Sequence, residues 1–262
     1  MENIIRSLGR FLINIATFFY DYTKFTTNVL KVALKLKIFN PAISLVFIRQ
    51  IYFTGVQILP MYSIVSLVFG VILVGGLTQG MDILGAPDQV SRIMVIIVLK
   101  ELAPLVTGIL LALRSSTAVI AEISLMKVHR QIDTLESLRI DPYEYLYLPR
   151  IASGLVSMVI LSTFFVCITV VGGYLILSIT QELSFDYMIT NIYDNLDFRD
   201  MVVFLIKVFV IGYVIMSVPI FTATQVKNAI TEIPVALLRG MMRLFYALIM
   251  VELLGLLAGI YL

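Results

Sequence analysis

The chain has 262 residues, of which 60% are hydrophobic and 14% are charged, and its mean hydropathy is +1.01. Soluble globular domains typically contain about 25% charged residues and about 45–50% apolar ones. A compact chain of this length cannot hide so much apolar surface from water. The composition therefore excludes a soluble enzyme, a disordered chain and a disulfide scaffold, and it predicts an all-α polytopic membrane protein.

Few residues of this chain could carry out chemistry. The formal net charge of +2 gives no indication of nucleic-acid binding, and Cys167 and His129 are the single cysteine and histidine. The sequence lacks the glycine-lysine pair of a P-loop and the G-x-S-x-G motif of serine hydrolases. We therefore expect no catalytic residue, no metal and no cofactor on this chain. Energy from ATP and Mg²⁺ would have to enter through a separate ATPase.

The first segment, residues 1–40, has the pattern of an amphipathic helix. Its polar stripe consists of Asn3, Arg6, Arg10, Asn14, Thr17 and Asp21, and its apolar stripe of Ile5, Leu8, Leu12, Ile15, Phe19 and Tyr22. This 3.6-residue period predicts a helix lying along the membrane interface. The alternative is a signal peptide, because residues 11–20 resemble a short apolar core. That alternative is less favoured, since Asn14 and Thr17 interrupt the core and no A-x-A site follows.

The remaining residues, 41–262, are expected to form one transmembrane permease domain. Long stretches with almost no charge predict five membrane-spanning helices, near residues 55–80, 90–113, 147–179, 201–224 and 240–261. A helix needs about 20 apolar residues to cross the hydrocarbon core. The glycines at 76 and 80, and at 255 and 259, have a spacing that permits close helix approach.

The distribution of Lys and Arg predicts how the chain is oriented. Seven of them fall in residues 1–49, five in residues 114–150 and three in residues 227–243, whereas the other two loops are acidic. The positive-inside rule then places the N-terminus in the cytoplasm and the C-terminus outside. The acidic residues between 182 and 200 are expected to face a partner on the outer side.

Lys100 and Glu101 are charged residues inside the second predicted span. A charge at mid-membrane costs about 2.5–3.5 kcal/mol on insertion scales. Adjacent residues of a helix point about 100° apart, so at least one of the two needs another partner, such as lipid headgroups, water, Lys207, Glu252 or a second subunit. Pro104 removes the helical donor to the Lys100 carbonyl and predicts a local bend. The pair is interpreted either as a structural ion pair or, as favoured here, as a polar element of a substrate cavity.

A second amphipathic helix is predicted over residues 121–139, between the second and third spans. Its apolar residues are Leu125, Val128, Ile132 and Leu135, and the Asp141–Pro142 pair ends it. The residues alone allow two interpretations: a solvated loop resting on the membrane, or a docking helix that inserts into a groove of a cytosolic protein.

Several motifs resemble those of the MlaE/YrbE permease family. They are KELAP at 100–104, AEISLMKV at 121–128, QIDTLE at 131–136, and the pairs Asp141–Pro142 and Pro149–Arg150. The segment RQIYFTG at 49–55 is similar to the entry to the family's first span. The resemblance covers about residues 45–262.

The resemblance implies the permease subunit of an ABC transporter that moves phospholipid between the inner and outer membranes of a diderm bacterium. It implies a homodimer in the inner membrane, with an interfacial helix and five spans in each copy. The implied partners are two cytosolic ATPase subunits that bind ATP and Mg²⁺, a periplasmic MCE-domain protein and a small cytosolic STAS-type subunit. No nucleic acid is involved.

The resemblance also implies roles for particular residues. Lys100, Glu101 and Pro104 would lie near a lipid cavity at the dimer interface. The residues on or near the ATPase-coupling helix would be Glu122, Met126, Lys127, Arg130, Asp133 and Glu136. At two places the chain departs from the family pattern. Arg114 is the one residue of a family glycine-arginine motif that is kept, and His129–Arg130 stands where the family commonly has Thr-Glu, which reverses a charge on the docking helix.

Two other functions compete with lipid transport. An ion-coupled secondary transporter would use Lys100, Glu101 and Glu252 as a relay within the membrane. A passive anchor would hold the ATPase and MCE proteins together while the lipid path runs elsewhere.

Overall fold

The computed structural model describes residues 2–35, 41–84, 90–175, 178, 197–227 and 229–261, and these residues are helical with short connections and no strand. The all-α fold expected from the composition is confirmed. The predicted outer-side acidic segment falls mostly within residues 179–196, outside the described residues, and so do the side chains of residues 2–15.

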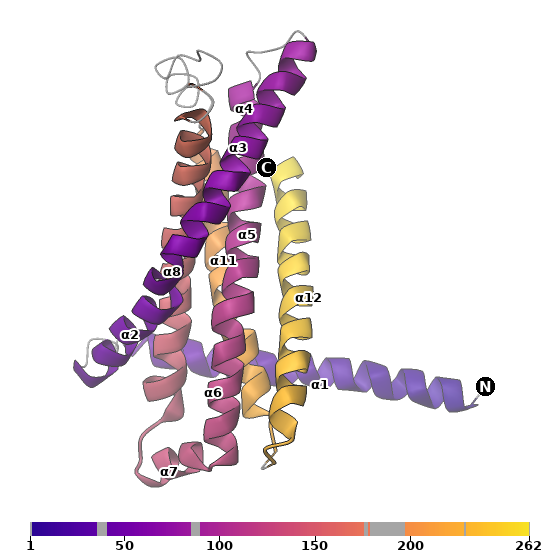
Figure 1. Cartoon of the computed structure of the whole chain (residues 1–262). Helices are drawn as coiled ribbons and strands as arrows, with labels where there is room; N and C mark the ends of the chain where they lie inside the picture. The colour runs from indigo at the N-terminus through magenta and orange to yellow at the C-terminus, as the bar shows by residue number, and fades with distance from the viewer. Residues whose placement is uncertain are drawn as a thin grey trace.

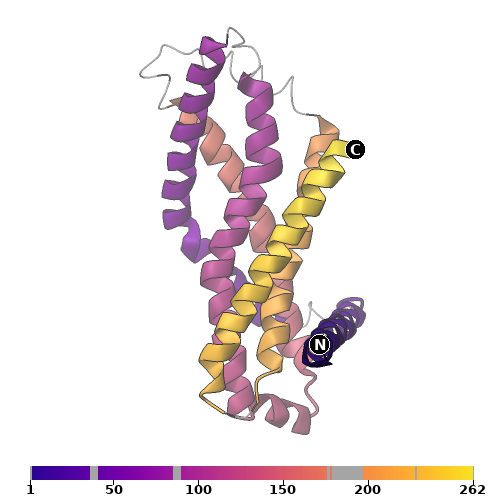
Figure 2. The ribbon, with the colours of Figure 1, turned by 90° about the vertical axis from the view of Figure 1, so that its right-hand side faces the viewer.

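Helix α1 (Glu2–Ala33) runs across one end of a bundle of long helices, transverse to their axes (Figures 1 and 2). Phe18, Tyr22 and Phe25 pack against the ring of Phe221 on α11, while Tyr20 on another face is exposed. A helix that attaches by one stripe and runs perpendicular to the spans has the geometry expected at a membrane surface.

Five helical stretches are long and apolar enough to cross a membrane, which agrees with the five spans predicted. They are Ile43–Met81, Arg92–Val128, Tyr143–Leu175, Phe198–Thr224 and Glu232–Leu257. The first is formed by α2 (Pro41–Thr54), η2 (Val56–Ile58) and α3 (Leu59–Ile83). The second is formed by α4 (Val90–Met94), η4 (Val95–Leu102), α5 (Ala103–Leu111), η5 (Ala112–Ser116) and α6 (Thr117–Val128). The third contains η6 (Tyr143–Tyr147), α8 (Leu148–Cys167) and η7 (Ile168–Gly172); the last two are α11 (Phe198–Thr224) and α12 (Glu232–Tyr261).

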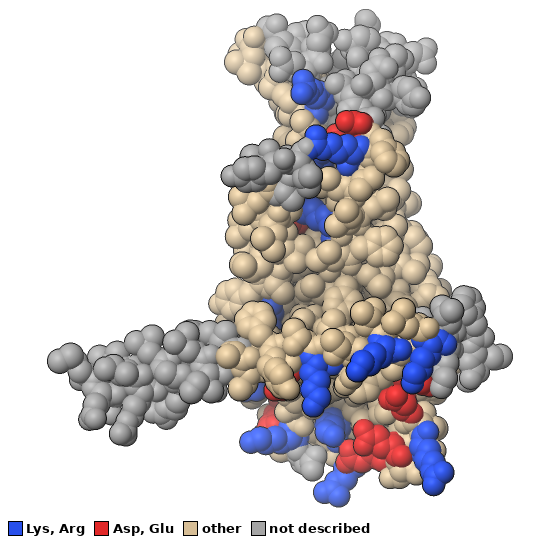
Figure 3. Space-filling view, turned by 180° about the vertical axis from the view of Figure 1, so that it is seen from behind, with Lys and Arg blue, Asp and Glu red and all other residues tan. Residues whose placement is uncertain are grey.

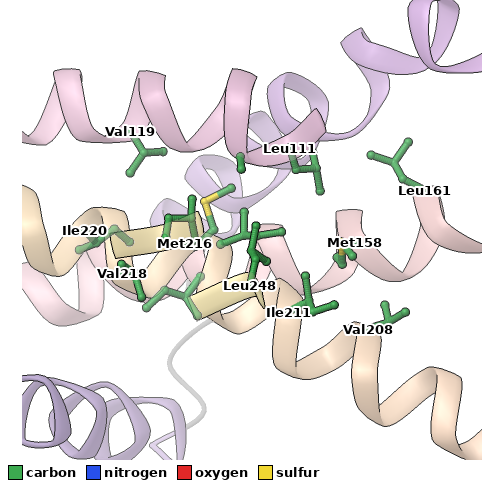
Figure 4. Close-up of a cluster of buried hydrophobic side chains, with 14 of the residues drawn as sticks. Leu111, Val119, Met158, Leu161, Val208, Ile211, Met216, Val218, Ile220 and Leu248 are labelled. Atoms are coloured by element: carbon green, nitrogen blue, oxygen red, sulfur yellow. The ribbon is translucent and has the colours of Figure 1, made fainter. Parts of the chain in front are cut away.

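Helix α11 is central, and its neighbours α5, α6, α8 and α12 pack around it. Figure 4 shows the core between them, where Leu111, Met158, Ile211 and Leu248 meet with almost no exposed surface. Gly212 permits the close approach of α8, because an added Cβ would lie 3.0 Å from the Met158 Cβ atom. Large apolar side chains cover the outer faces of α3 and α12, as expected for helices that face lipid.

The structure corrects the prediction of a single helix over residues 121–139. Helix α6 ends at Val128, and α7 (Gln131–Ser137) begins after Arg130, whose backbone is left-handed at φ 55°. The apolar period continues through this break, because Ile132 turns back and is buried against the bundle. Of the four apolar residues in the predicted stripe, Ile132 is buried and Leu125 is exposed, and the periodicity also missed the turn between two helices.

Charged side chains gather at the end of the molecule that contains α1 and α7, below a broad band of uncharged surface (Figure 3). The start of α4, the start of α11 and the end of α12 lie at the opposite end (Figure 1). Figure 3 also shows a smaller group of charged side chains near the opposite end, so the end with α1 and α7 is the more charged of the two.

Candidate functional site

An ion-pair network lies inside the bundle, in the half away from α7, and Lys207 of α11 is its centre. The Lys207 Nζ atom donates to Glu101 Oε2 of η4 at 2.8 Å and contacts Glu252 Oε2 of α12 at 2.5 Å. Its third acceptor is the carbonyl oxygen of Lys100, at 2.8 Å. An ammonium group has three donors, so each N–H of Lys207 has an acceptor.

Pro104 explains why the Lys100 carbonyl is free to accept this bond. Proline has no backbone N–H, so the usual helical donor four residues after Lys100 is absent. The backbone widens here into η4, a π-helical segment, which is often found at functional sites. Lys207 thus satisfies a carbonyl that the helix itself leaves open.

Lys100 points to a different partner, Asp200 in the first turn of α11, with 2.5 Å between Nζ and Oδ1. Adjacent residues diverge on a helix, so Lys100 and Glu101 reach two different groups on α11. Asp200 and Lys207 lie two turns apart on α11 and face the same neighbour. The two ion pairs join the second and fourth spans.

Burial makes this network energetically important. Lys207 is 5% exposed and Glu252 is 9% exposed, and the Glu252 Oε1 atom has no hydrogen-bond partner among the described residues. A buried charge that loses its partner costs several kcal/mol. Gly255 makes room for the lysine stem, because an added Cβ would lie 3.1 Å from the Lys207 Cε atom. The network therefore holds the second, fourth and fifth spans in one arrangement.

Lys207 and Glu252 were among the partners expected for Lys100 and Glu101. The structure places both near Glu101, because Lys207 contacts Glu101 and Glu252 together. The sequence had not identified Asp200 as the partner of Lys100. The available signal was the two-turn spacing of Asp200 and Lys207, which places both residues on the same face of α11. Whether Lys100, Glu101 and Pro104 also line a lipid cavity stays a proposal.

The residues predicted for ATPase coupling fall into three groups. Met126 and Glu122 line a cavity in the bundle, and the Glu122 carboxylate accepts a 2.6 Å bond from Arg150. Lys127 and Asp133 form a 3.2 Å ion pair that bridges α6 and α7. Arg130 and Glu136 remain exposed at the charged end of the molecule.

The cavity that Glu122 and Met126 line has a volume of about 600 Å³ and lies between α2, the η5–α6 segment and the start of α8. Arg49, Arg114 and Arg150 also line it, whereas Lys100, Glu101 and Pro104 do not. The cavity thus occupies the half of the bundle opposite to the ion-pair network.

Helix α1 is held near this end by hydrogen bonds as well as aromatic contacts. The hydroxyls of Tyr22 and Ser217 lie 2.6 Å apart, and Tyr213 donates to Thr26 at 3.0 Å. Burial raises the pKa of the Tyr22 hydroxyl from its usual value near 10 to about 12, so the side chain stays neutral at ordinary pH. Within the described residues, no three His, Cys, Asp or Glu side chains are placed to hold a metal ion.

Known proteins are similar to this chain over most of its length. A family model described as permease MlaE matches residues 47–257. A probable ABC transporter permease of Rickettsia felis is 27% identical over 221 residues, which cover 84% of this chain and 83% of that protein. A probable ABC transporter permease of Rickettsia prowazekii is 29% identical over 175 residues, or 67% and 68% of the two chains.

The Haemophilus influenzae protein named intermembrane phospholipid transport system permease protein MlaE is 36% identical over 132 residues, or 49% of each chain. The family match covers the five spans, the ion-pair network and the α6–α7 turn. Permease subunits of this kind are non-catalytic, and ATP is hydrolysed by a separate ATPase subunit. This multi-pass membrane protein therefore belongs to the MlaE family of ABC transporter permeases.

Proposed function

We propose that this chain is the permease subunit of a transporter that moves phospholipids between the inner and outer membranes and so maintains outer-membrane lipid asymmetry. It works as a homodimer in the inner membrane, with its N-terminus in the cytoplasm and its C-terminus in the periplasm. Two copies of the ATPase, which bind ATP and Mg²⁺, attach on the cytoplasmic side. A periplasmic MCE-domain protein and a small cytosolic STAS-type subunit complete the assembly.

Membership of the MlaE family and the printed function of the Haemophilus relative support this proposal. The concentration of charged side chains around α1 and α7 supports a cytoplasmic position for that end (Figure 3). A cysteine placed at Thr231, in the exposed turn before α12, should be labelled by an impermeant reagent only from the cytoplasmic side. Labelling from the periplasm would contradict the orientation.

The observation that carries the mechanism is the buried contact of Lys207 with both Glu101 and Glu252. When ATP-driven closure of the ATPase pair moves the α6–α7 turn, the second span moves with it. The network transmits that movement to α11 and α12, because separating these helices would leave charges unpaired in the membrane. The spans then repack around a lipid cavity near Lys100, Glu101 and Pro104.

Transport by a charge-reversed variant tests this mechanism. Glu101→Lys places a second ammonium beside Lys207, and Lys100→Asp places a second carboxylate beside Asp200. Each should abolish ATP-dependent transfer of a fluorescent phospholipid from proteoliposomes while the ATPase still co-purifies. Arg92→Gln, an exposed residue at the same end of the bundle, is the matched control. Full transfer by both reversed variants would refute the role of the network.

The α6–α7 turn is proposed to be the ATPase contact, through its exposed residues Arg130 and Glu136. Lys127 and Asp133 fix the angle of the turn, and Glu122 and Met126 support it from the bundle side. Glu136→Lys or Arg130→Glu should reduce co-purification of the ATPase by about tenfold, since rim charges control such encounters. The exposed Arg199→Glu, at the opposite end, should not. Full retention of the ATPase by the first two variants would exclude this contact.

A secondary transporter is the alternative that the network also permits, because Glu101, Lys207 and Glu252 form a chain of ionisable groups inside the membrane. Such a transporter would be active when purified without an ATPase. Recovery of an ATPase in stoichiometric amount, together with transport that requires ATP, would exclude it. A passive anchor would bind its partners normally and show no transport defect in the Glu101→Lys variant.

A further inference from the structure

The cavity in the charged half of the bundle is lined by three arginines from three different segments. Arg49 comes from α2, Arg114 from η5 and Arg150 from α8. The volume of about 600 Å³ falls within the range of about 300–1,000 Å³ that is typical of small-ligand sites. Three guanidinium groups inside one cavity need a physical explanation, because like charges repel each other and resist removal from water.

Positive charge exceeds negative charge in this cavity. Among the described residues that line the cavity, Glu122 is the one carboxylate, and it pairs with Arg150 at 2.6 Å while more than half exposed. Arg114 makes only a long bond, 3.3 Å, to the carbonyl oxygen of Phe53, and the Arg49 guanidinium lies over the Phe53 ring. Within the part of the chain that the structure describes, neither Arg49 nor Arg114 has an ion-pair partner.

Arg150 shows most clearly that the site is incomplete. Its side chain is only 4% exposed, yet its Nε atom has no hydrogen-bond partner in the described part of the chain. Burial of a donor without an acceptor is costly, and native proteins satisfy the great majority of such groups. An acceptor with several oxygens would satisfy this atom and the free donors of Arg114 together. Phosphate is that acceptor, since guanidinium groups bind it with paired N–H donors.

The cavity wall also contains apolar side chains beside its polar ones, which favours an amphiphilic ligand. Val46 of α2, Val119 of α6 and Leu146, one helical turn before Arg150, contribute aliphatic surface. Gln50 and Gln57 add neutral amides that can bond to glycerol or ester oxygens. A free inorganic anion would not bind to apolar side chains. A phospholipid has a phosphate that can bind the arginines and acyl chains that can contact the apolar side chains.

The cavity lies near the level at which α1 crosses the bundle. Phe25 of α1 contacts Tyr143 and Tyr147, and Arg150 follows Tyr147 by less than one helical turn, about 4.5 Å along the axis. Helix α1 runs across the bundle at this level (Figure 1), and since we expect it to lie along the membrane interface, we expect lipid headgroups around the molecule here. An anionic headgroup can therefore reach the arginines without leaving the interface.

We propose that this cavity binds the phosphate of an anionic phospholipid from the leaflet on the α1 side, held by Arg49, Arg114 and Arg150. The first acyl carbons lie along Val46 and Val119. This site is separate from the Lys100–Glu101 region, and binding requires neither the ATPase nor transport. Its test is therefore independent of the proposed transport function.

Native mass spectrometry of the purified full chain can count retained lipids. The probes are dioleoylphosphatidylglycerol and the zwitterionic dioleoylphosphatidylcholine, each added at matched concentrations. The wild-type chain should retain the anionic lipid about tenfold more tightly than the zwitterionic one. Arg114→Gln, at a partly exposed position, and Arg49→Gln, at an exposed one, should each weaken that retention about tenfold. Arg92→Gln, at the opposite end of the bundle, should leave it unchanged.

Three results would overturn the proposal. Equal retention by the Arg114→Gln, Arg49→Gln and Arg92→Gln variants would show that the cavity is not the site. Displacement of the lipid by inorganic phosphate at the lipid's own concentration would show that the ligand is a soluble anion. Arginine variants that lose the dimer peak in the same spectra, with lipid retention unchanged, would show that a second copy of the chain covers the cavity.

Discussion

The two halves of the bundle differ in how completely their buried charged groups are paired. Around Lys207, three acceptors meet three donors, and each of the two lysines of the network has a carboxylate within 2.8 Å. Around Arg150, by contrast, a buried donor has no acceptor, and two further arginines have no ion-pair partner in the described residues. In the first arrangement every donor of the central lysine has an acceptor, and only the Glu252 Oε1 atom lacks a partner among the described residues. The second is complete only when an anion is added.

This difference separates charges that hold the helices together from charges that are available for binding. A paired charge inside a membrane resists change, because its removal leaves its partner unsatisfied. An unpaired charge at the interface carries no such penalty, because removing it leaves nothing behind. Substitutions in the Lys207 network should therefore mainly reduce stability, whereas substitutions of the cavity arginines should mainly reduce lipid binding.

The largest effect is expected for Lys207→Met, which leaves Glu101 and Glu252 without their shared ammonium. Loss of one partner of a buried ion pair typically costs about 3–5 kcal/mol. The variant should show a large loss of stability in thermal unfolding of the detergent-solubilised protein. The triple variant Lys207→Met, Glu101→Gln, Glu252→Gln should recover most of it. A single variant as stable as the wild type would mean that the network does not hold the spans.

Much of the helical architecture could be predicted from the sequence, but some features of it could not. The five spans follow from apolar length, and the amphipathic period identified Ile132 as an inward-facing residue. The break at Arg130 was not predictable, because a left-handed residue in a charged turn leaves the period intact. The arginine-lined cavity was also beyond sequence reasoning, since Arg49, Arg114 and Arg150 come together only when three helices pack.

A smaller effect is expected for Gly255→Val, which tests whether the lysine stem needs the space beside α12. An added Cβ would lie 3.1 Å from Lys207 Cε, so the lysine stem must shift, and the two γ-carbons of valine add to this crowding. Overpacking of this kind costs about 1–3 kcal/mol. Gly76→Val is the matched control, because nothing in the described chain lies within 4 Å of its added Cβ. Equal loss of stability in both variants would argue against the close fit at Gly255.

The attachment of α1, which sets the level of the cavity, should depend on pH at the alkaline end. The folded-state pKa of Tyr22, about 12, lies above its usual value near 10, so its contribution is fully present below pH 10 and declines as pH rises toward 12. Limited proteolysis of α1 should therefore accelerate in that range. Tyr22→Phe should cost about 1 kcal/mol and weaken the pH dependence. An unchanged pH profile in that variant would show that other groups hold α1.

The smallest effect on stability is expected in the cavity itself. Arg150→Met removes a desolvated charge and frees Glu122, which is already more than half exposed to solvent. Because the Glu122 carboxylate stays in contact with solvent, the substitution leaves no buried charge unpaired, so the change should stay within about 1 kcal/mol. The same variant should lose anionic lipid in native mass spectra. A loss of stability as large as that of Lys207→Met would show that Arg150 holds the helices together as strongly as Lys207 does.

The most direct test of this distinction is an experimental structure of the full chain in nanodiscs that contain phosphatidylglycerol. We predict headgroup density within hydrogen-bond distance of Arg114 and of the Arg150 Nε atom. We also predict that the Lys207 ammonium stays between Glu101 and Glu252, with no lipid phosphate beside it. An empty arginine cavity, or a headgroup phosphate bound to Lys207 in place of its carboxylates, would contradict the proposed difference between the two regions.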